Sequence, residues 1–174
     1  MSTTNPITFP PAVANLLANL PVAPLGPGKP DESVRAELTA LNDASFGHVT
    51  DPEMAACCRS GLWLAFNFLD ESHRISQDHE TSTGNFWHAI MHRREPDPSN
   101  SKYWWRRVGA HPVFDQLRER AASLDYTYTT PEAFVDFCEK GRDTGSAHEE
   151  LAKRVQLAEW QLLFEWCWRK AVGT

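Results

Sequence analysis

The chain has 174 residues, of which 41% are hydrophobic and 23% charged, and a formal net charge of −6. These values are typical of one folded domain and exclude wholesale disorder and a fibrous repeat. The negative charge argues against nucleic acid as the main partner, because a protein that coats nucleic acid needs a net basic face.

Prolines dominate the first 30 residues, which contain seven of the twelve in the chain. Proline fixes the backbone and removes a hydrogen-bond donor, so this density excludes long regular structure. A short helix can still start at Pro11, with Leu16, Leu17 and Leu20 on its inner face. We therefore divide the chain into a proline-rich N-terminal arm, 1–30, docked on the body, and a single helical domain, 31–174.

Helix start signals recur after residue 30. Asp31 is a cap for a short helix, and Asp51 followed by Pro52 predicts a long helix to about Gln77. The next helix is expected over roughly 85–94, ending before Pro96. A turn at 97–100 then provides the cap of another short helix.

The C-terminal half repeats this pattern. Pro112 and Pro131 begin further helices, and Ser146 with Glu149 forms a capping box that opens the last one. Apolar residues in that last helix recur with a period of 3.6, so it is expected in the core. The sequence predicts an all-α fold, a compact bundle of about six or seven helices.

Apolar runs are too short for a membrane span, which needs roughly 18 apolar residues. The longest candidate, Leu157 to Trp168, is interrupted by Glu159 and Glu165. The first residues also lack the basic start and apolar block of a secretory signal. We expect no membrane association and a cytoplasmic location.

Histidines and carboxylates recur at helical spacing in the middle of the chain. Phe66, Asp70, His73 and Gln77 share one face of the predicted long helix. His88, His92 and Glu95 follow at i, i+4 and i+7 on the next helix. Two imidazoles and a carboxylate can therefore point to one spot, and the preceding helix can add ligands.

This spacing is one that metals use, because ring nitrogens from consecutive helical turns reach the same ion. The predicted ligands of a divalent metal (Zn, Fe or Mn) are Asp70, His73, His88, His92 and Glu95. If the protein is an enzyme, His73, His88 and His92 act in hydrolysis, with metal-bound water or as general bases. The alternative interpretation is that these histidines are hydrogen-bonded packing residues.

Arginines and aromatic residues alternate immediately after this segment. Guanidinium groups bind carboxylate and phosphate, and aromatic faces accept rings, so the combination suits a small anionic ligand. The expected ligand-binding residues are Gln77, Arg93, Tyr103, Arg106 and Arg107. The alternative is a non-catalytic module in which the same groups form ion pairs between helices or a surface for homo-oligomerisation.

Three blocks in the middle third of the chain also carry a resemblance. They read LDESHRISQ (69–77), WHAIMHRRE (87–95) and NSKYWWRRVG (100–109). Together they resemble a family of uncharacterised proteins with similar W-H-x-I-M-H-R-R-E blocks. The resemblance implies a shared local site, and no activity, cofactor or fold comes with it.

Overall fold

A computed structural model describes residues 7–174, which form nine α-helices, two 3₁₀ helices and no β-strand. The elements in chain order are α1 (Pro11–Ala18), η1 (Glu32–Val34), α2 (Arg35–Ala40), η2 (Asp43–Phe46), α3 (Pro52–Ala65), α4 (Leu69–Ser76), α5 (Ser82–Arg94), α6 (Pro98–Val108), α7 (Val113–Ala122), α8 (Pro131–Gly141) and α9 (Ala147–Val172). The predicted all-α bundle is confirmed, and the predicted count of six or seven helices is too low for these residues.

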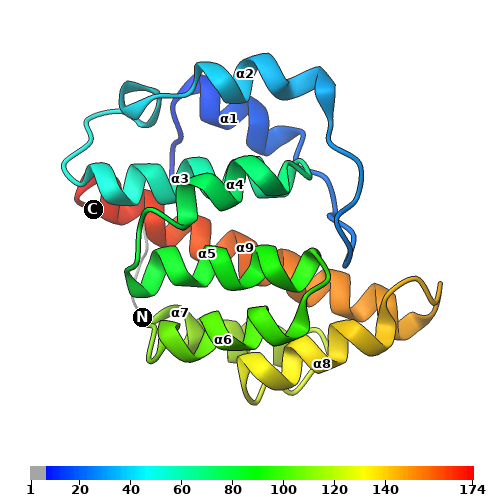
Figure 1. Ribbon diagram of the computed structural model, residues 1–174. Helices are drawn as coiled ribbons and strands as arrows, with labels where there is room; N and C mark the ends of the chain where they lie inside the picture. The colour runs from blue at the N-terminus through cyan, green and yellow to red at the C-terminus, as the bar shows by residue number, and fades with distance from the viewer. Residues whose placement is uncertain (1–6) are drawn as a thin grey trace.

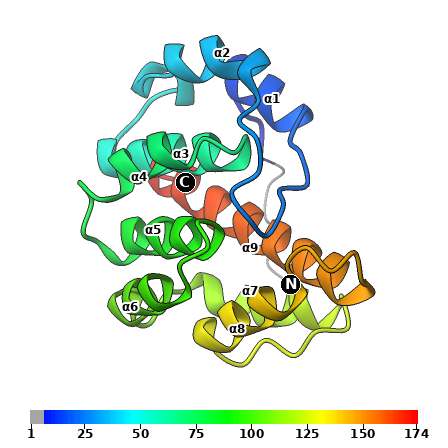
Figure 2. The same cartoon turned by 45° about the vertical axis from the view of Figure 1, so that its right-hand side comes forward.

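The helices stack in tiers. Figure 1 shows α1 and α2 uppermost, then α3 and α4, then α5, with α6, α7 and α8 below. Helix α9 runs behind the middle tiers and packs against α3, α7 and α8 (Figures 1 and 2). Helix α5 therefore has α4 on one side and α6 on the other. None of the helices in 7–174 combines the length and apolar character of a membrane span.

Helix α9 begins where the capping signal predicts. The Ser146 hydroxyl accepts a hydrogen bond from the Glu149 backbone N–H at 3.2 Å. Its predicted apolar stripe is buried at Trp160, Leu163, Phe164, Cys167 and Ala171. This 26-residue helix is thus the central packing element of the core.

The predicted long helix from Pro52 to Gln77 is wrong, because the chain turns between α3 and α4. Asn67 has a left-handed backbone with φ of 68°, and the phenylalanines on either side, Phe66 and Phe68, are both buried. A continued helix would place the two rings 200° apart around its axis, so they could not both face the same side. The turn allows both rings to be buried, and this burial stabilises it. Phe66 consequently follows α3 as its C-cap, whereas Asp70 and His73 lie on α4 and Gln77 is the C-cap of that helix.

The described part of the N-terminal arm packs on the body. Val13, Leu16 and Leu25 are buried in the core. The Arg94 guanidinium group donates to the backbone carbonyls of Gly26 and Pro27 at 3.2 and 3.3 Å. Residues 1–6 of the predicted arm lie outside the described residues.

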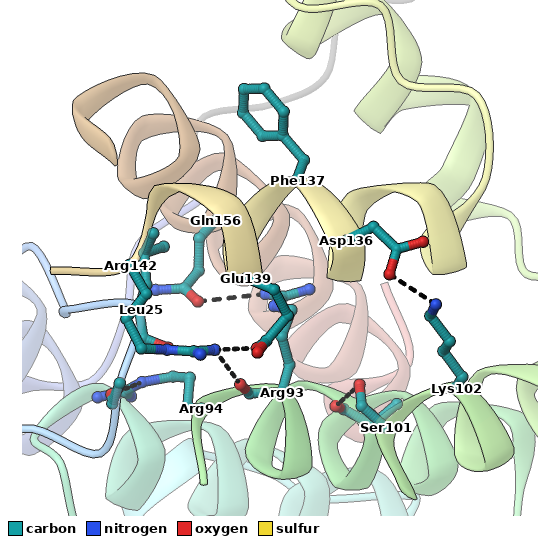
Figure 3. A network of polar contacts seen from close by, with 12 residues as sticks. Leu25, Arg93, Arg94, Ser101, Lys102, Asp136, Phe137, Glu139, Arg142 and Gln156 are labelled. Atoms are coloured by element: carbon teal, nitrogen blue, oxygen red, sulfur yellow. Dashed lines mark hydrogen bonds and ion pairs between the residues drawn. The ribbon is translucent and has the colours of Figure 1, made fainter. Parts of the chain in front are cut away.

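Polar side chains of α5, α8 and α9 also hold the N-terminal arm on the body (Figure 3). Gln156 of α9 donates to the carbonyls of Ala23 and Pro24 and accepts from Arg93 of α5. Arg142, at the end of α8, donates to the Leu25 and Arg93 carbonyls and pairs with Glu139. Three helices and the arm are therefore linked by one buried and half-buried network.

Candidate functional site

Three histidines from two helices meet between α4 and α5. His88 and His92 lie one turn apart on α5 and share a face, as their spacing predicts. His73 of α4 faces both, with ring centroids 4.7 Å from His88 and 5.3 Å from His92. One ring nitrogen of each histidine lies within 4.8 Å of the others. The structure thus brings together all three residues predicted to be catalytic.

These rings form one wall of an open cleft. The other lining side chains come from the end of α4, the segment before α5, and α6, and they are Gln77, Asp78, Glu80, Asn100 and Trp104. Trp104 stacks on His88 with ring centroids 3.9 Å apart and an interplanar angle of 20°. The cleft is therefore polar, with a single large aromatic surface.

Gly84 allows the segment before α5 to close on that helix. A Cβ atom at this position would lie 1.8 Å from the His79 carbonyl oxygen, a contact that no side chain tolerates. Thr81 caps the same end, accepting a hydrogen bond from the Gly84 N–H at 3.2 Å. This close approach sets the position of Asp78 and Glu80 beside the histidines.

Burial keeps two of the histidines neutral. It lowers the pKa of His88 to about 3, with further lowering by the neighbouring His92 and His73. Burial and then His92 also lower the pKa of His73. Neutral imidazole has a free lone pair, which is the form that binds a metal ion.

His88 also carries a buried nitrogen, Nδ1, that lacks a hydrogen-bond partner within the described residues. Such an atom costs free energy unless another group contacts it. A coordinated metal ion is one such contact. Hydrogen bonds within the described residues therefore do not satisfy the histidine cluster fully.

The third histidine is held by a carboxylate. Nδ1 of His92 lies 2.6 Å from Oε2 of Glu95, the residue that ends α5. The amide nitrogen of Asn100 lies 3.3 Å from both ring nitrogens of His92. His92 is thus oriented from two sides, whereas His73 and His88 contact mainly other rings.

The remaining predicted metal ligands are placed differently. Glu95 contacts His92 and belongs to a second possible cluster with His92 and Asp97. Asp70 is exposed on the first turn of α4 and is in neither cluster of potential ligands found in residues 7–174. The histidines therefore converge, and the predicted carboxylates do not join them at one point.

Arg93 does not lie where the sequence analysis expects it. Its side chain is 0% exposed and pairs with the equally buried Glu159 of α9, at 2.5 Å. Arg93 belongs to the network of Figure 3, where it also donates to Gln156 of α9. Arg93, predicted to bind an anion, therefore does not line the cleft. No local pattern in the sequence indicates its partner, which is 66 residues away.

The other predicted ligand-binding residues lie on or near the rim. Gln77 is exposed and lines the cleft. Arg107 pairs with Glu80 at 3.0 Å, and its guanidinium carbon lies 5.4 Å from the Trp104 ring centroid. Tyr103, 45% exposed, contacts the same arginine. Arg106 is exposed and does not line the cleft.

Sequence reasoning missed two residues that shape the cleft. Local patterns in the sequence place Asn100 only in the turn at 97–100 and Trp104 only within the block 100–109. Both reach the histidines because the chain reverses at 95–98 and returns α6 alongside α5. No local spacing reports such a contact between consecutive helices.

No family model, curated protein or solved structure matches the chain.

Proposed function

We propose that the chain binds a divalent metal ion, Zn²⁺ in the first place, through His73, His88 and His92. The observation that carries the proposal is the approach of three ring nitrogens within 4.8 Å of one another. Two nitrogens bound to one Zn²⁺ at about 2.0 Å each are at most about 4 Å apart. Small rotations of the rings are therefore enough to form the site.

The donor set favours zinc over manganese. Three imidazoles suit Zn²⁺, whereas Mn²⁺ prefers carboxylate oxygens, and Asp70 lies outside the cluster. The lowered pKa values of His73 and His88 keep their nitrogens available at neutral pH. Protons therefore compete weakly with the metal.

A site of three histidines leaves a fourth position open for water. Zinc lowers the pKa of bound water to about 7 and thereby supplies a nucleophile for hydrolysis. Because the cleft is open, a small substrate can reach this position. We propose metal-assisted hydrolysis as the reaction class.

The rim indicates the kind of substrate. Arg107 can bind one anionic group, because its pair with Glu80 is exposed and costs little to exchange. Asp78 and Glu80 lie on the same wall and disfavour a polyanion. The expected substrate is a small molecule with a single negative charge.

The test is a zinc titration of protein without a histidine tag, in competition with a chelating dye. The wild type is expected to bind one Zn²⁺. His73→Ala and His88→Phe should weaken binding by more than the roughly 10- to 100-fold typical of losing an outer partner. Phenylalanine at 88 keeps a ring against Trp104. His48→Ala, at an exposed histidine outside the cleft, should bind like the wild type.

Two results would overturn the proposal: a wild type that binds no zinc, or equal affinity in His73→Ala. A wild type without zinc, together with lower thermal stability of His88→Ala, would support the alternative of a packing network. Hydrolysis is tested separately with bis(p-nitrophenyl) phosphate, which carries a single negative charge. Zinc-dependent turnover that His73→Ala abolishes is the expected result, and equal turnover by both proteins would exclude this site.

A further inference from the structure

We infer that Glu95 is a positioning residue for the metal and not a ligand: its carboxylate holds Nδ1 of His92, so that Nε2 becomes the coordinating atom. The inference rests on the proposed function. It assigns a single nitrogen of His92 to the metal and removes Glu95 from the predicted ligands.

The hydrogen bond between the two side chains determines which nitrogen is free. An ionised carboxylate only accepts hydrogen bonds, so the 2.6 Å contact requires the proton on Nδ1 of His92. The neutral ring then carries its lone pair on Nε2.

The surroundings of His92 support the same assignment. Its ring is nearly parallel to that of His88, with an interplanar angle of 21° and centroids 4.8 Å apart. A fixed orientation of His92 therefore also limits how His88 can turn. The Asn100 amide nitrogen lies 3.3 Å from both ring nitrogens, and with the proton on Nδ1 it can donate only to Nε2, so it has to turn away when a metal ion binds there. The Asn100 backbone N–H is held by the Asp97 carboxylate at 3.0 Å.

A direct role of Glu95 as a ligand conflicts with this geometry. Two clusters of potential ligands occur in the described chain, and only His92 belongs to both. To share an ion with His73 and His88, Glu95 would have to leave His92. Metal-bound histidines commonly donate their other N–H to a carboxylate, which fixes the ring and makes it more basic.

The test uses Zn²⁺ and Co²⁺ with Glu95→Gln and Glu95→Ala. Both variants should bind Zn²⁺ about 10- to 100-fold more weakly than the wild type. The visible absorption bands of bound Co²⁺ should keep their positions, because the ligands do not change. The matched control is Glu119→Gln, which removes the same charge from the exposed side of α7. It should bind Zn²⁺ like the wild type.

Each outcome decides a different point. Shifted Co²⁺ bands in Glu95→Gln would make Glu95 a ligand, and unchanged affinity would remove its role altogether. An equal loss of Zn²⁺ affinity in Glu119→Gln would mean that the loss comes from the change in net charge and not from the contact between Glu95 and His92. In all three cases metal binding itself stands. A wild type that binds no Zn²⁺ is the separate result that overturns the proposed function, and the inference with it.

Discussion

The two sides of α5 use polar residues in opposite ways. On the side facing the arm and α9, the terminal nitrogens of Arg93 and Arg94 donate to a carboxylate, two amide groups and backbone carbonyls. On the side facing α4 and α6, His88 and His92 are nearly as buried. There the contacts are mainly ring against ring. A buried side-chain nitrogen without a partner in the described chain occurs on both sides, Nε of Arg93 on the first and Nδ1 of His88 on the second.

Under the proposed function, this difference separates polar groups that hold the fold from polar groups that bind a ligand. A buried charge is tolerated only when paired, so Arg93 and Arg94 need Glu159 and the carbonyls, and they thereby fix helices and arm. A neutral imidazole needs less compensation and retains a lone pair for a ligand. The predictions below test whether the two sides are independent.

The largest effect is expected on the arginine side. Glu159→Ala leaves Arg93 buried without its counterion and should lower the free energy of unfolding by about 3–5 kcal/mol, measured by urea denaturation. The double variant Arg93→Met with Glu159→Leu should lose far less, because no charge remains buried. Zinc affinity of the folded protein should not change. A loss below about 1 kcal/mol in Glu159→Ala would show that the pair does not fix the helices.

A smaller effect is expected on the histidine side. Zinc at 100 times its dissociation constant should raise the free energy of unfolding of the wild type by about 2.7 kcal/mol, because only the folded state binds. His73→Ala should show no such gain at the same concentration. Equal gains in both proteins, measured by the same urea titration, would place the metal elsewhere.

The smallest effect is expected for His111, which lies on neither side of α5. Burial lowers the pKa of His111 from 6.5 to about 4, while its Nδ1 accepts a hydrogen bond from the Val113 N–H. Between pH 4 and 6.5, His111 is therefore protonated in the unfolded state and neutral in the folded state. Stability should therefore fall as the pH drops from 6.5 to 4, by up to about 1 kcal/mol per pH unit from this group.

This prediction is checked by measuring the free energy of unfolding against pH for the wild type and for His111→Gln, in the presence of a chelator, and comparing the two slopes. His111→Gln should show a shallower loss of stability with acid than the wild type, whatever its stability at pH 7. An unchanged slope would mean that His111 titrates alike in the folded and unfolded chains.

Local signals in the sequence were sufficient for much of the fold. Asp51 caps α3 and Ser146 caps α9 at the predicted places, because capping depends on a few neighbouring atoms. The turn at Asn67 was not predictable in this way. It is stabilised by the burial of Phe66 and Phe68 and by a hydrogen bond from Arg94, which is 27 residues away.

The histidine cluster was also predictable in part, namely where it depends on local spacing along a helix. Spacing places His88 and His92 on one face, and that local rule holds in the structure. The reason for adding His73 was incomplete, because the helix thought to align it with Phe66 is interrupted. The partners of Arg93, and the contact of Trp104 with His88, depend on how helices pack and leave no local pattern.

The most direct test of the histidine cluster is zinc-edge X-ray absorption of the zinc-loaded protein. The account predicts three imidazole nitrogens at about 2.0–2.1 Å around the ion, with the remaining ligand an oxygen. Sulfur at about 2.3 Å, or fewer than three imidazoles, would contradict it.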